Sequence, residues 1–403
     1  MNNKLIFLLF CVFAFLSCAK NKKTQISDIP VLKISDLKIV KSLEFEDPDY
    51  FDKVEFIKLE TTNESILGEI TQMEIFENHI YILDSKGISL KKFDLTGKYL
   101  QDIGRIGLGP GEYIAITVFY INPVLKTINI FDPMKESILQ YDFLGKHVKT
   151  IKLDVSDFTF VSRLSMLNNN DEIFCFSYAN WESNCEFSIL NEKNYKGKCI
   201  YQYPVKTDKQ MSFQITNHTY TVRNGEVHYV LMFSDTIYSY SKNEISKLLV
   251  VESGKPAIEP KQLSQIASEN DNHFLLTIIN ASRKGYSTGL KNIFESDLYI
   301  CCDFYAHTDY TPIAAILWNK TTNMGVYLSE YLTVSPCFSF ISYCFDNTFV
   351  RIWEGQHITT FKENINNGLY EKEHYPAKVW EVLDNYNEDD DNPILIFYTM
   401  KKD

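Results

Sequence analysis

An internal repeat constrains the fold of this chain more than any other sequence feature. The segment IYILDSKGISLKKFDLTGKYLQDI at 80–103 aligns with INIFDPMKESILQYDFLGKHVKTI at 128–151. In both copies an apolar strand ends in an aspartate (Asp84 or Asp132), a second strand follows, and a Gly-Lys turn leads into a third. Self-similarity at a period of about 40–50 residues, with short strands and tight turns, is typical of β-propeller blades.

The remainder of the chain carries the same strand signals. Short apolar runs are separated by Gly, Asn, Asp and Lys, and Phe, Tyr and Trp make up 14% of the sequence, which suits half-buried strands. A weaker copy of the repeat lies at 227–250, with its turn at Asp235. Helical periodicity is confined to short stretches near 259–269 and 374–386. The chain is therefore predicted to be all-β.

Six blades account for most of the chain, and we predict a six-bladed β-propeller of four-stranded antiparallel blades over residues 49–403. The blades are placed at about 69–104, 113–153, 158–203, 211–254, 272–331 and 334–361. Strand-like segments at 54–60 and 393–400 are left over at the two ends. A propeller closes its ring when one terminus completes a blade built by the other, so we expect one or both to do so. Residues 362–392 are predicted to form an insertion with a short helix.

The glycine-rich stretch IGRIGLGPGEY at 103–113 has two interpretations. A phosphate-binding loop would run from a strand into a helix and end in Lys-Ser or Lys-Thr, and neither feature follows here. A linker between blades needs left-handed turns, which glycine allows, and Pro110 would stiffen it. We therefore expect this stretch to carry the chain from the outer strand of one blade to the inner strand of the next.

The amino terminus has the pattern of a secretory signal. One basic residue, Lys4, precedes an apolar run of about 12 residues, which is too short for the roughly 20 that span a bilayer. Ser17 and Cys18 follow, as in bacterial lipoproteins, where the cysteine is acylated and becomes the new amino terminus. We predict a signal peptide at 1–17, lipid attachment at Cys18 and a tether at 18–48. An ordinary signal peptide that is cut elsewhere is the alternative.

Charge and cysteine usage exclude some classes of function. The formal net charge of -12 argues against nucleic-acid binding, which needs Lys and Arg to neutralise phosphates. The nine cysteines include no C-x-x-C pair, so neither a zinc knuckle nor a thioredoxin-like motif is present. Cysteines in apolar runs are expected to pack as small hydrophobic residues, with room for one or two disulfides in an oxidising periplasm. The sequence does not determine their pairing.

Candidate functional side chains are sparse, and each has a structural alternative. Asp84, Asp132 and Asp235 suggest a ring of carboxylates, but an aspartate at the first turn residue after a strand usually binds nearby backbone, and we favour that role. The eight histidines form no H-E-x-x-H motif. The histidines that fall near strand ends, and so could approach a central channel as metal ligands, are His218, His228 and His307.

Two further features offer ligand chemistry. The acidic run NEDDDN at 387–392 could bind a hard cation, but it lacks the Gly and final Glu of a calcium loop, so we expect a solvated loop. Aromatic residues that could stack on sugar rings, unless they pack in the core as most aromatics do, are Trp181, Tyr220, Tyr305, Tyr310 and Trp318. No G-x-S-x-G elbow and no nucleophile with a visible base is present. No catalytic residue is therefore assigned, and the metal, cofactor and ligand-binding residues stay unknown.

Several segments of the chain resemble a known family. Those similar to the six-bladed β-propeller lipoproteins of Bacteroidetes, which are distant relatives of NHL-repeat propellers, are KVEFIKLETTNESILGEI at 53–70, IGLGPGEY at 106–113, FSDTIYSYSKNEI at 233–245 and DDDNPILIFYTMKK at 389–402. The resemblance spans nearly the whole mature chain and is densest over 54–151. It implies a propeller located in the cell envelope, and it implies no particular activity.

Two hypotheses about function follow. The first is a non-catalytic binding or scaffold module, lipid-anchored in the outer membrane, that presents the propeller to a glycan, a peptide or an envelope partner protein. The alternative is a propeller enzyme of lyase or lactonase type with a metal in the central channel. We favour the binding module, because no catalytic set is visible. The residues after Cys18, AKNKK, lack the acidic pair that often marks surface export in these bacteria, which favours the periplasmic side.

Overall fold

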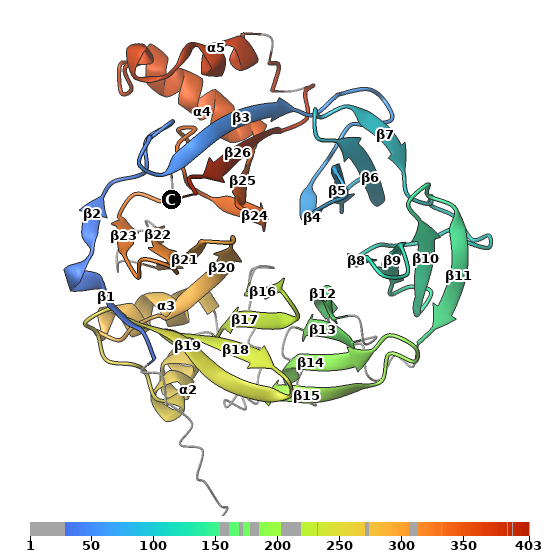
Figure 1. Cartoon of the computed structure of the whole chain (residues 1–403), viewed down its shortest axis with the longest axis horizontal. Helices are drawn as coiled ribbons and strands as arrows, with labels where there is room; N and C mark the ends of the chain where they lie inside the picture. The colour runs from blue at the N-terminus through green and yellow to red at the C-terminus, as the bar shows by residue number, and fades with distance from the viewer. Residues whose placement is uncertain are drawn as a thin grey trace, which may run out of the picture.

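Six β-sheets surround a central axis, and each contains the four antiparallel strands of one blade (Figure 1). The predicted six-bladed propeller is confirmed. The computed structural model describes residues 29–153, 161–168, 172–177, 185–202, 219–231, 233–270, 274–305, 313–331, 333–384, 386–388 and 390–402. Among these residues no helix is long and apolar enough to cross a membrane.

Blades 1 to 3 are built from consecutive strands, with the innermost strand first. Blade 1 consists of β4 (Ile70–Phe76), β5 (His79–Asp84), β6 (Ser89–Asp94) and β7 (Tyr99–Asp102). Blade 2 consists of β8 (Val118–Asn122), β9 (Thr127–Asp132), β10 (Ser137–Asp142) and β11 (His147–Lys152). Blade 3 consists of β12 (Val161–Asn168), β13 (Glu172–Ser177), β14 (Cys185–Asn191) and β15 (Gly197–Gln202). The last three strands of blade 2 begin at the positions that the repeat predicts from those of blade 1.

Blades 4 and 5 follow the same strand order. Blade 4 consists of β16 (Tyr220–Arg223), β17 (Glu226–Val230), β18 (Thr236–Ser241) and β19 (Glu244–Glu252). Blade 5 consists of β20 (Leu290–Glu295), β21 (Tyr299–Tyr305), β22 (Ile313–Asn319) and β23 (Gly325–Leu328). Each of these two sheets gains a fifth strand at its outer edge, and both added strands come from the amino-terminal segment.

The amino-terminal segment at 31–40, which we call the strap, crosses the outside of blades 4 and 5 (Figure 1). Its elements are β1 (Val31–Lys33), η1 (Ile34–Asp36) and β2 (Lys38–Val40). β1 pairs in parallel with β19, and β2 pairs in parallel with β23. These residues fall within the predicted tether at 18–48, so this part of it is ordered against the ring. Such short strands leave no alternation that could be recognised in the sequence.

Both chain ends close the ring in blade 6. The strands of this blade are β24 (Ile341–Phe345), β25 (Thr348–Trp353), β26 (Ile394–Met400) and β3 (Phe51–Lys58). β26 pairs with β25 on one side and with β3 on the other, so β3 forms the outer edge. The expectation that one or both terminal strands complete a blade is confirmed for both. The closure removes the exposed edges that an open ring would have.

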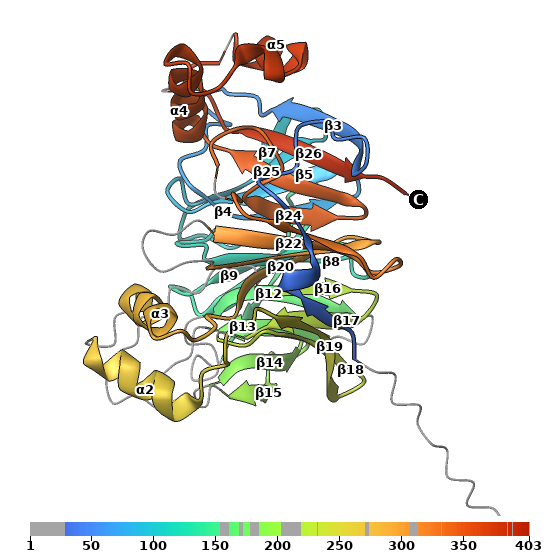
Figure 2. The same cartoon turned by 90° about the vertical axis from the view of Figure 1, so that its left-hand side faces the viewer.

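The α-helices of the described residues lie toward one face of the ring and its rim (Figure 2). α2 (Pro260–Glu269) and α3 (Phe274–Arg283) connect blades 4 and 5. α4 (Gly355–Asn366), η3 (Lys372–His374) and α5 (Ala377–Leu383) lie between β25 and β26. The sequence predicted α2 and α5. It placed α3 in a blade, because the Leu and Ile residues of this helix are as apolar as those of a strand, and it wrongly assigned residues 355–361 of α4 to the sixth blade. The first strand of blade 5 therefore begins at Leu290 rather than near residue 272.

Two repeated aspartates hold the corners of blades 1 and 2. The carboxylate of Asp84 accepts bonds of 2.9–3.1 Å from the backbone N–H groups of Gly68, Glu69, Lys86 and Gly87. The carboxylate of Asp132 accepts bonds of 2.7–3.0 Å from those of Ile114, Met134 and Lys135. Each aspartate thus joins the turn after the second strand to the chain that enters the same blade. The structural role predicted for these two residues is confirmed.

Asp235 in blade 4 behaves differently, and its predicted role is wrong. The pairing of Ile237 with Val230 places Leu231, rather than Asp235, at the position that Asp132 has in blade 2. The strand-end position is therefore apolar, and Asp235 lies at the far end of the turn. Its carboxylate accepts bonds from side-chain hydroxyl groups rather than from the local backbone.

The glycine-rich stretch connects β7 of blade 1 to β8 of blade 2, as the linker interpretation predicts. Gly104 and Gly111 have φ angles of +71° and +72°, which only glycine adopts readily. A Cβ atom on Gly111 would lie 2.5 Å from the ring of His147. Glu112 closes the loop, because it accepts bonds from the Arg105 side chain at 2.7 Å and from the Gly109 N–H at 2.8 Å.

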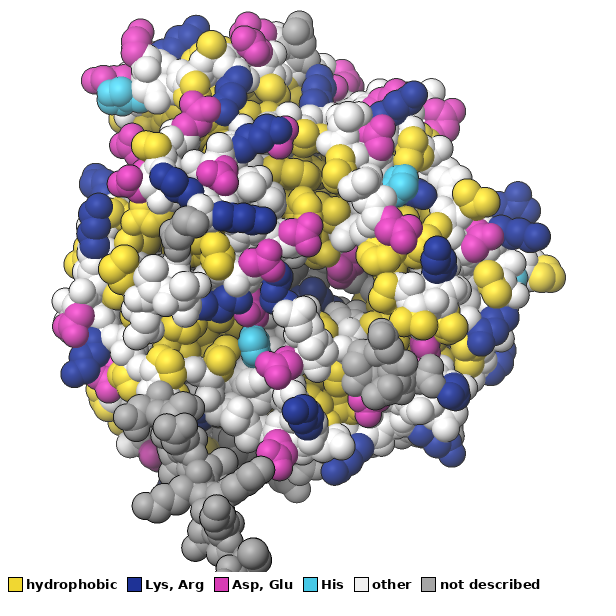
Figure 3. Space-filling view, in the orientation of Figure 1, with side chains coloured by type: hydrophobic (Ala, Val, Ile, Leu, Met, Phe, Trp, Pro, Cys, Tyr) yellow, Lys and Arg dark blue, Asp and Glu magenta, His cyan; other side chains and the backbone are white. Residues whose placement is uncertain are grey.

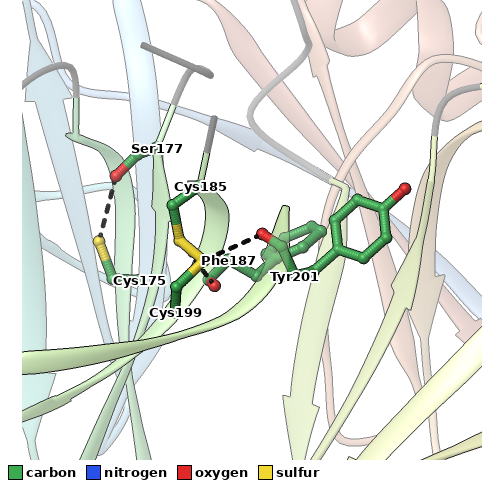
Figure 4. Close-up of a disulfide and its surroundings, with 6 residues drawn as sticks. All are labelled: Cys175, Ser177, Cys185, Phe187, Cys199 and Tyr201. Atoms are coloured by element: carbon green, nitrogen blue, oxygen red, sulfur yellow. Dashed lines mark hydrogen bonds between the residues drawn. A yellow bond between two sulfur atoms is a disulfide. The ribbon is translucent and has the colours of Figure 1, made fainter. Parts of the chain in front are cut away.

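One disulfide joins two strands of blade 3. Cys185 on β14 and Cys199 on β15 form it, and Cys175 lies close by on β13 (Figure 4). Among the described residues, the free cysteines that are buried are Cys175, Cys301, Cys302 and Cys337, whereas Cys344 is half-buried. Both expectations for the cysteines are therefore confirmed: most pack as apolar residues, and one pair is oxidised.

Candidate functional site

The innermost strands of the blades line a central channel that contains a cavity of about 240 Å³. Five of the six inner strands contribute to its wall, namely β4, β8, β12, β16 and β24. The polar side chains in this wall belong to Glu74, Arg163, Ser165, Thr221 and Tyr343. Each comes from a strand whose buried residues pack between neighbouring blades, so the ring brings together groups that lie far apart in the sequence.

Glu74 on β4 is the centre of a hydrogen-bond network across the channel. One carboxylate oxygen accepts the Tyr343 hydroxyl at 2.8 Å, and the other lies 3.8 Å from the Arg163 guanidinium. The backbone N–H of Ile75 donates to the same Tyr343 oxygen at 3.2 Å. The network joins blades 1, 3 and 6. The distance between the two charged groups makes the Glu74–Arg163 pair looser than a direct hydrogen bond.

Arg163 is held against blade 4. Its guanidinium donates to the Tyr220 carbonyl oxygen at 2.9 Å and lies 4.7 Å from the centre of the Tyr220 ring. The Tyr220 hydroxyl in turn lies 3.0 Å from the Ser165 hydroxyl. A cation over an aromatic face is stabilised by the ring quadrupole, and the planar guanidinium is thereby fixed in one orientation. A donor with a fixed orientation is suited to bind an oxygen-rich group.

A second charged cluster lies between blades 4 and 5, at the last residue of β20. Glu295 is 3% exposed, and its two oxygens bind His228 and Lys320, each at 2.6 Å. Nearby, Arg223 forms an ion pair with Asp297. Because α2 and α3 precede β20, this cluster lies on the face opposite these helices. Figure 3 shows that face, where acidic and basic side chains surround the central opening.

Burial and neighbouring charges shift the pKa values of these groups. Burial raises the pKa of Tyr343 well above its ordinary value, and the adjacent Glu74 carboxylate raises it further. Burial also acts on Glu295, but the hydrogen bonds and positive charges of His228 and Lys320 prevail and lower its pKa. Around neutral pH the channel therefore contains a neutral tyrosine hydroxyl group, and the cluster contains an ionised Glu295.

The structure describes one of the three candidate histidines and part of the acidic run at 387–392. His228 is bound to Glu295, whereas His218 and His307 lie outside the described residues, as does Cys18. No group of three or more His, Cys, Asp or Glu side chains suited to a metal ion occurs in the described ranges. In the acidic run, Asp391 forms a 2.8 Å ion pair with Lys58 of β3, so at least this carboxylate joins the insertion to blade 6.

The aromatic residues considered as sugar platforms are core residues where the structure describes their side chains. Tyr220 packs on Phe174 with ring centroids 4.7 Å apart, and Trp318 is 5% exposed. Trp181, Tyr310 and the side chain of Tyr305 lie outside the described residues. The aromatic side chains that do line the channel cavity are Phe76, Tyr120 and Tyr343, and no sequence signal singled them out.

The sequence also missed Glu74 and Arg163. Each is the only charged residue of its strand, with no motif around it, so its importance appears only when the ring is closed. A usable signal would have been the position itself, because a charged residue inside the first strand of a blade must face either the channel or a neighbouring blade.

A six-bladed β-propeller with a polar cavity in its central channel is the class of protein that the fold and this site define. The chain belongs to the family described as a domain of unknown function, DUF4934, which matches residues 29–399. Comparison of the sequence with curated proteins finds no match.

Two solved structures are similar to this chain over most of its length. A protein from Bacteroides fragilis that is described as exported is 18% identical, with a TM-score of 0.72 over 92% of this chain and 99% of the other. A member of the DUF4221 family from Bacteroides vulgatus is 11% identical, with a TM-score of 0.54 over 90% of this chain and 98% of the other. Both similarities concern the fold alone. The predicted resemblance to propellers of Bacteroidetes is confirmed, whereas the link to NHL repeats stays a prediction.

Proposed function

We propose that this protein is a non-catalytic binding module of the cell envelope, which takes part of a glycan, a peptide or a partner protein into its central channel. The observation that carries this proposal is the network of Glu74, Arg163 and Tyr343, which brings an acceptor, a cation and a hydroxyl group from three blades to one cavity. Polar groups that converge on one cavity give a site orientation and specificity.

The size of the cavity limits what enters it. A volume of about 240 Å³ lies below the roughly 300–1,000 Å³ typical of pockets that enclose a whole drug-sized ligand. The occupant is therefore one unit of a larger molecule, such as a sugar residue of a glycan or a side chain of a peptide. The remainder of that molecule lies on the charged face seen in Figure 3.

The proposed location is the outer membrane, with the lipid anchor at Cys18 and the propeller on the periplasmic side. Three observations support a location outside the cytoplasm: the signal-like amino terminus, the exported structural relative, and the Cys185–Cys199 disulfide. With two or three acyl chains on Cys18, attachment to the membrane would be stable, because a single chain gives only marginal binding.

The test is crosslinking and recovery of full-length acylated protein from its own membranes, with Cys18→Ala as the anchoring control and Glu74→Gln as the channel control. We expect a stoichiometric glycan or protein partner that is lost or strongly reduced in Glu74→Gln. A partner that is retained in Glu74→Gln and crosslinks only to the outer rim would contradict a channel site. Recovery that is unchanged in Cys18→Ala would contradict the role of the anchor.

A further inference from the structure

A second and larger cavity, of about 410 Å³, lies between blades 4 and 5 beneath the strap. It is at the helix-bearing end of these blades, since its wall includes residues that follow β19 and residues that precede β20. Its volume falls within the range of roughly 300–1,000 Å³ that is typical of small-molecule sites. It shares no lining residue with the channel cavity.

Most of the wall of this cavity is apolar. Ile34 and Ile39 of the strap cover one side, and Val251 and Leu290 are buried on the blades. Phe304 and Tyr327 of blade 5 form an aromatic pair with ring centroids 5.8 Å apart, and burial raises the pKa of Tyr327. A hydrocarbon or aromatic group would be well accommodated by such a wall.

One carboxylate in this wall is bound by neutral hydroxyl groups, and it has no charged partner among the described residues. Asp235 accepts hydrogen bonds from Ser287 and, at 3.4 Å, from Ser253, and no Lys or Arg in the described residues forms an ion pair with it. In this respect Asp235 differs from Asp84 and Asp132, whose carboxylate oxygens accept hydrogen bonds from backbone N–H groups. Burial raises the pKa of Asp235, and the hydrogen bonds from Ser287 and Ser253 offset this effect only in part.

A cation lines the same cavity. Lys255 contributes to the wall, is half-buried, and forms no ion pair with any described residue. Asp235 and Lys255 are not paired with one another, so each can pair with an opposite charge on a bound molecule. A ligand that carries both charges and an apolar body would satisfy all parts of the wall at once.

We propose that this cavity is a binding site for a small zwitterion with an apolar body, that is, an apolar amino acid or a compound of the same chemistry. Its ammonium group binds Asp235, its carboxylate binds Lys255, and its side chain lies against the Phe304–Tyr327 pair. The proposal is independent of the channel, and failure of either proposal leaves the other intact.

The test is isothermal titration calorimetry of the full-length protein in detergent with three probes. Phenylalanine carries both charges, 2-phenylethylamine lacks the carboxylate, and 3-phenylpropionate lacks the amino group. We expect phenylalanine to bind most tightly and phenylpropionate at least about tenfold more weakly, because the contact with Asp235 is a charged hydrogen bond. Equal binding of phenylpropionate and phenylethylamine, or no binding of either amine at millimolar concentration, would overturn the proposal.

Variants assign the contacts. Asp235→Asn should lower the affinity for both amines at least about tenfold. Lys255→Ala should lower the affinity for phenylalanine and leave the affinity for phenylethylamine unchanged. Ile39→Ala, at a position that is 66% exposed, should weaken binding about two- to threefold with little effect on folding. Asp142→Asn, in an exposed turn of blade 2, is the matched control and should bind normally.

Two further results separate binding from folding. Thermal unfolding of each variant without probe identifies a variant that has simply lost its structure. If Asp235→Asn does not fold, the selective effect of Lys255→Ala tests the proposal, and an equal loss of affinity for both amines would contradict the assignment.

The location of the bound probe is tested separately. Loss of phenylalanine binding in Glu74→Gln would place the probe in the channel and overturn the proposal. Hydrogen exchange at 31–40 should slow when phenylalanine binds, because the strap forms one wall.

Discussion

Asp132 ends the second strand of blade 2 and Asp235 lies in the turn after the second strand of blade 4, and their surroundings differ in kind. Asp132 is completely buried, and three backbone N–H groups donate to it. Asp235 is only half-buried, borders a cavity, and accepts hydrogen bonds from side-chain hydroxyl groups. A repeated residue type therefore does not imply a repeated role. The partners of the carboxylate decide whether it stabilises a turn or remains available to bind a ligand.

The largest effect is expected at the structural aspartate. Asp132→Ala would leave three backbone N–H groups near a corner of blade 2 without their acceptor, and each unsatisfied buried donor is costly. We expect a loss of about 3 kcal/mol in the free energy of unfolding, measured by urea denaturation. Asp142→Ala, in an exposed turn of the same blade, is the matched control and should lose less than about 1 kcal/mol. Equal losses would mean that burial of the carboxylate is unimportant.

Glu295 extends the comparison to a carboxylate with charged partners. Glu295→Gln would leave Lys320 without its counter-charge and weaken the hydrogen bond with His228, and we expect a loss of about 2 kcal/mol near neutral pH. Because the folded-state pKa of Glu295 is lowered, its stabilising effect is present above the unfolded pKa of about 4.3 and is lost as pH falls through the folded pKa. The unfolding free energies of wild type and variant should therefore converge at acid pH. A difference that does not depend on pH would contradict this role.

Glu186 on β14 is the opposite case, a buried carboxylate with too few partners. It is 2% exposed, one of its oxygens has no hydrogen-bond partner among the described residues, and burial raises its pKa to about 8. A raised folded-state pKa gives stability that is present below the unfolded pKa of about 4.3 and is lost as pH rises through about 8.

We therefore expect Glu186→Gln to stabilise the protein by about 1–2 kcal/mol at pH 8, with no gain at pH 4. Chemical denaturation at the two pH values measures this difference. Glu269→Gln is a suitable control, because this exposed glutamate pairs with Lys284 at the surface and should show no gain at pH 8. A gain of equal size at both pH values would show that the titration of Glu186 is not responsible.

The sequence predicted the architecture well where the repeat is regular and poorly where the chain departs from it. Corresponding strands of blades 1 and 2 keep the same spacing because their turns are formed by local residues such as Asp132, and such residues can be recognised in a single sequence. The strap was missed because its pairing partners, β19 and β23, lie far away in the sequence. α3 was missed because its apolar composition does not distinguish a helix from a strand.

The sites were harder to predict than the fold for a related reason. Glu74, Arg163 and Tyr343 are assembled by closure of the ring, and no local pattern marks any of them. The sequence did single out Asp235 and His228. The role predicted for Asp235 was wrong, and Glu295, the partner of His228, was not predicted. A residue type can be read locally, whereas the groups it meets in a propeller are set by neighbouring blades.

The smallest effect on stability is expected at Asp235, and it completes the comparison. Burial raises the folded-state pKa of this carboxyl group, so its ionised form contributes no stability at neutral pH. Asp235→Asn should therefore change the free energy of unfolding by no more than about 0.5 kcal/mol without ligand, in contrast to Asp132→Ala. Phenylalanine should raise the midpoint of thermal unfolding of wild type but not of this variant, because only an ionised Asp235 binds the ammonium group. A large loss without ligand would give Asp235 the same structural role as Asp132, whereas a small loss together with loss of the ligand effect is what distinguishes a binding residue from one that supports the fold.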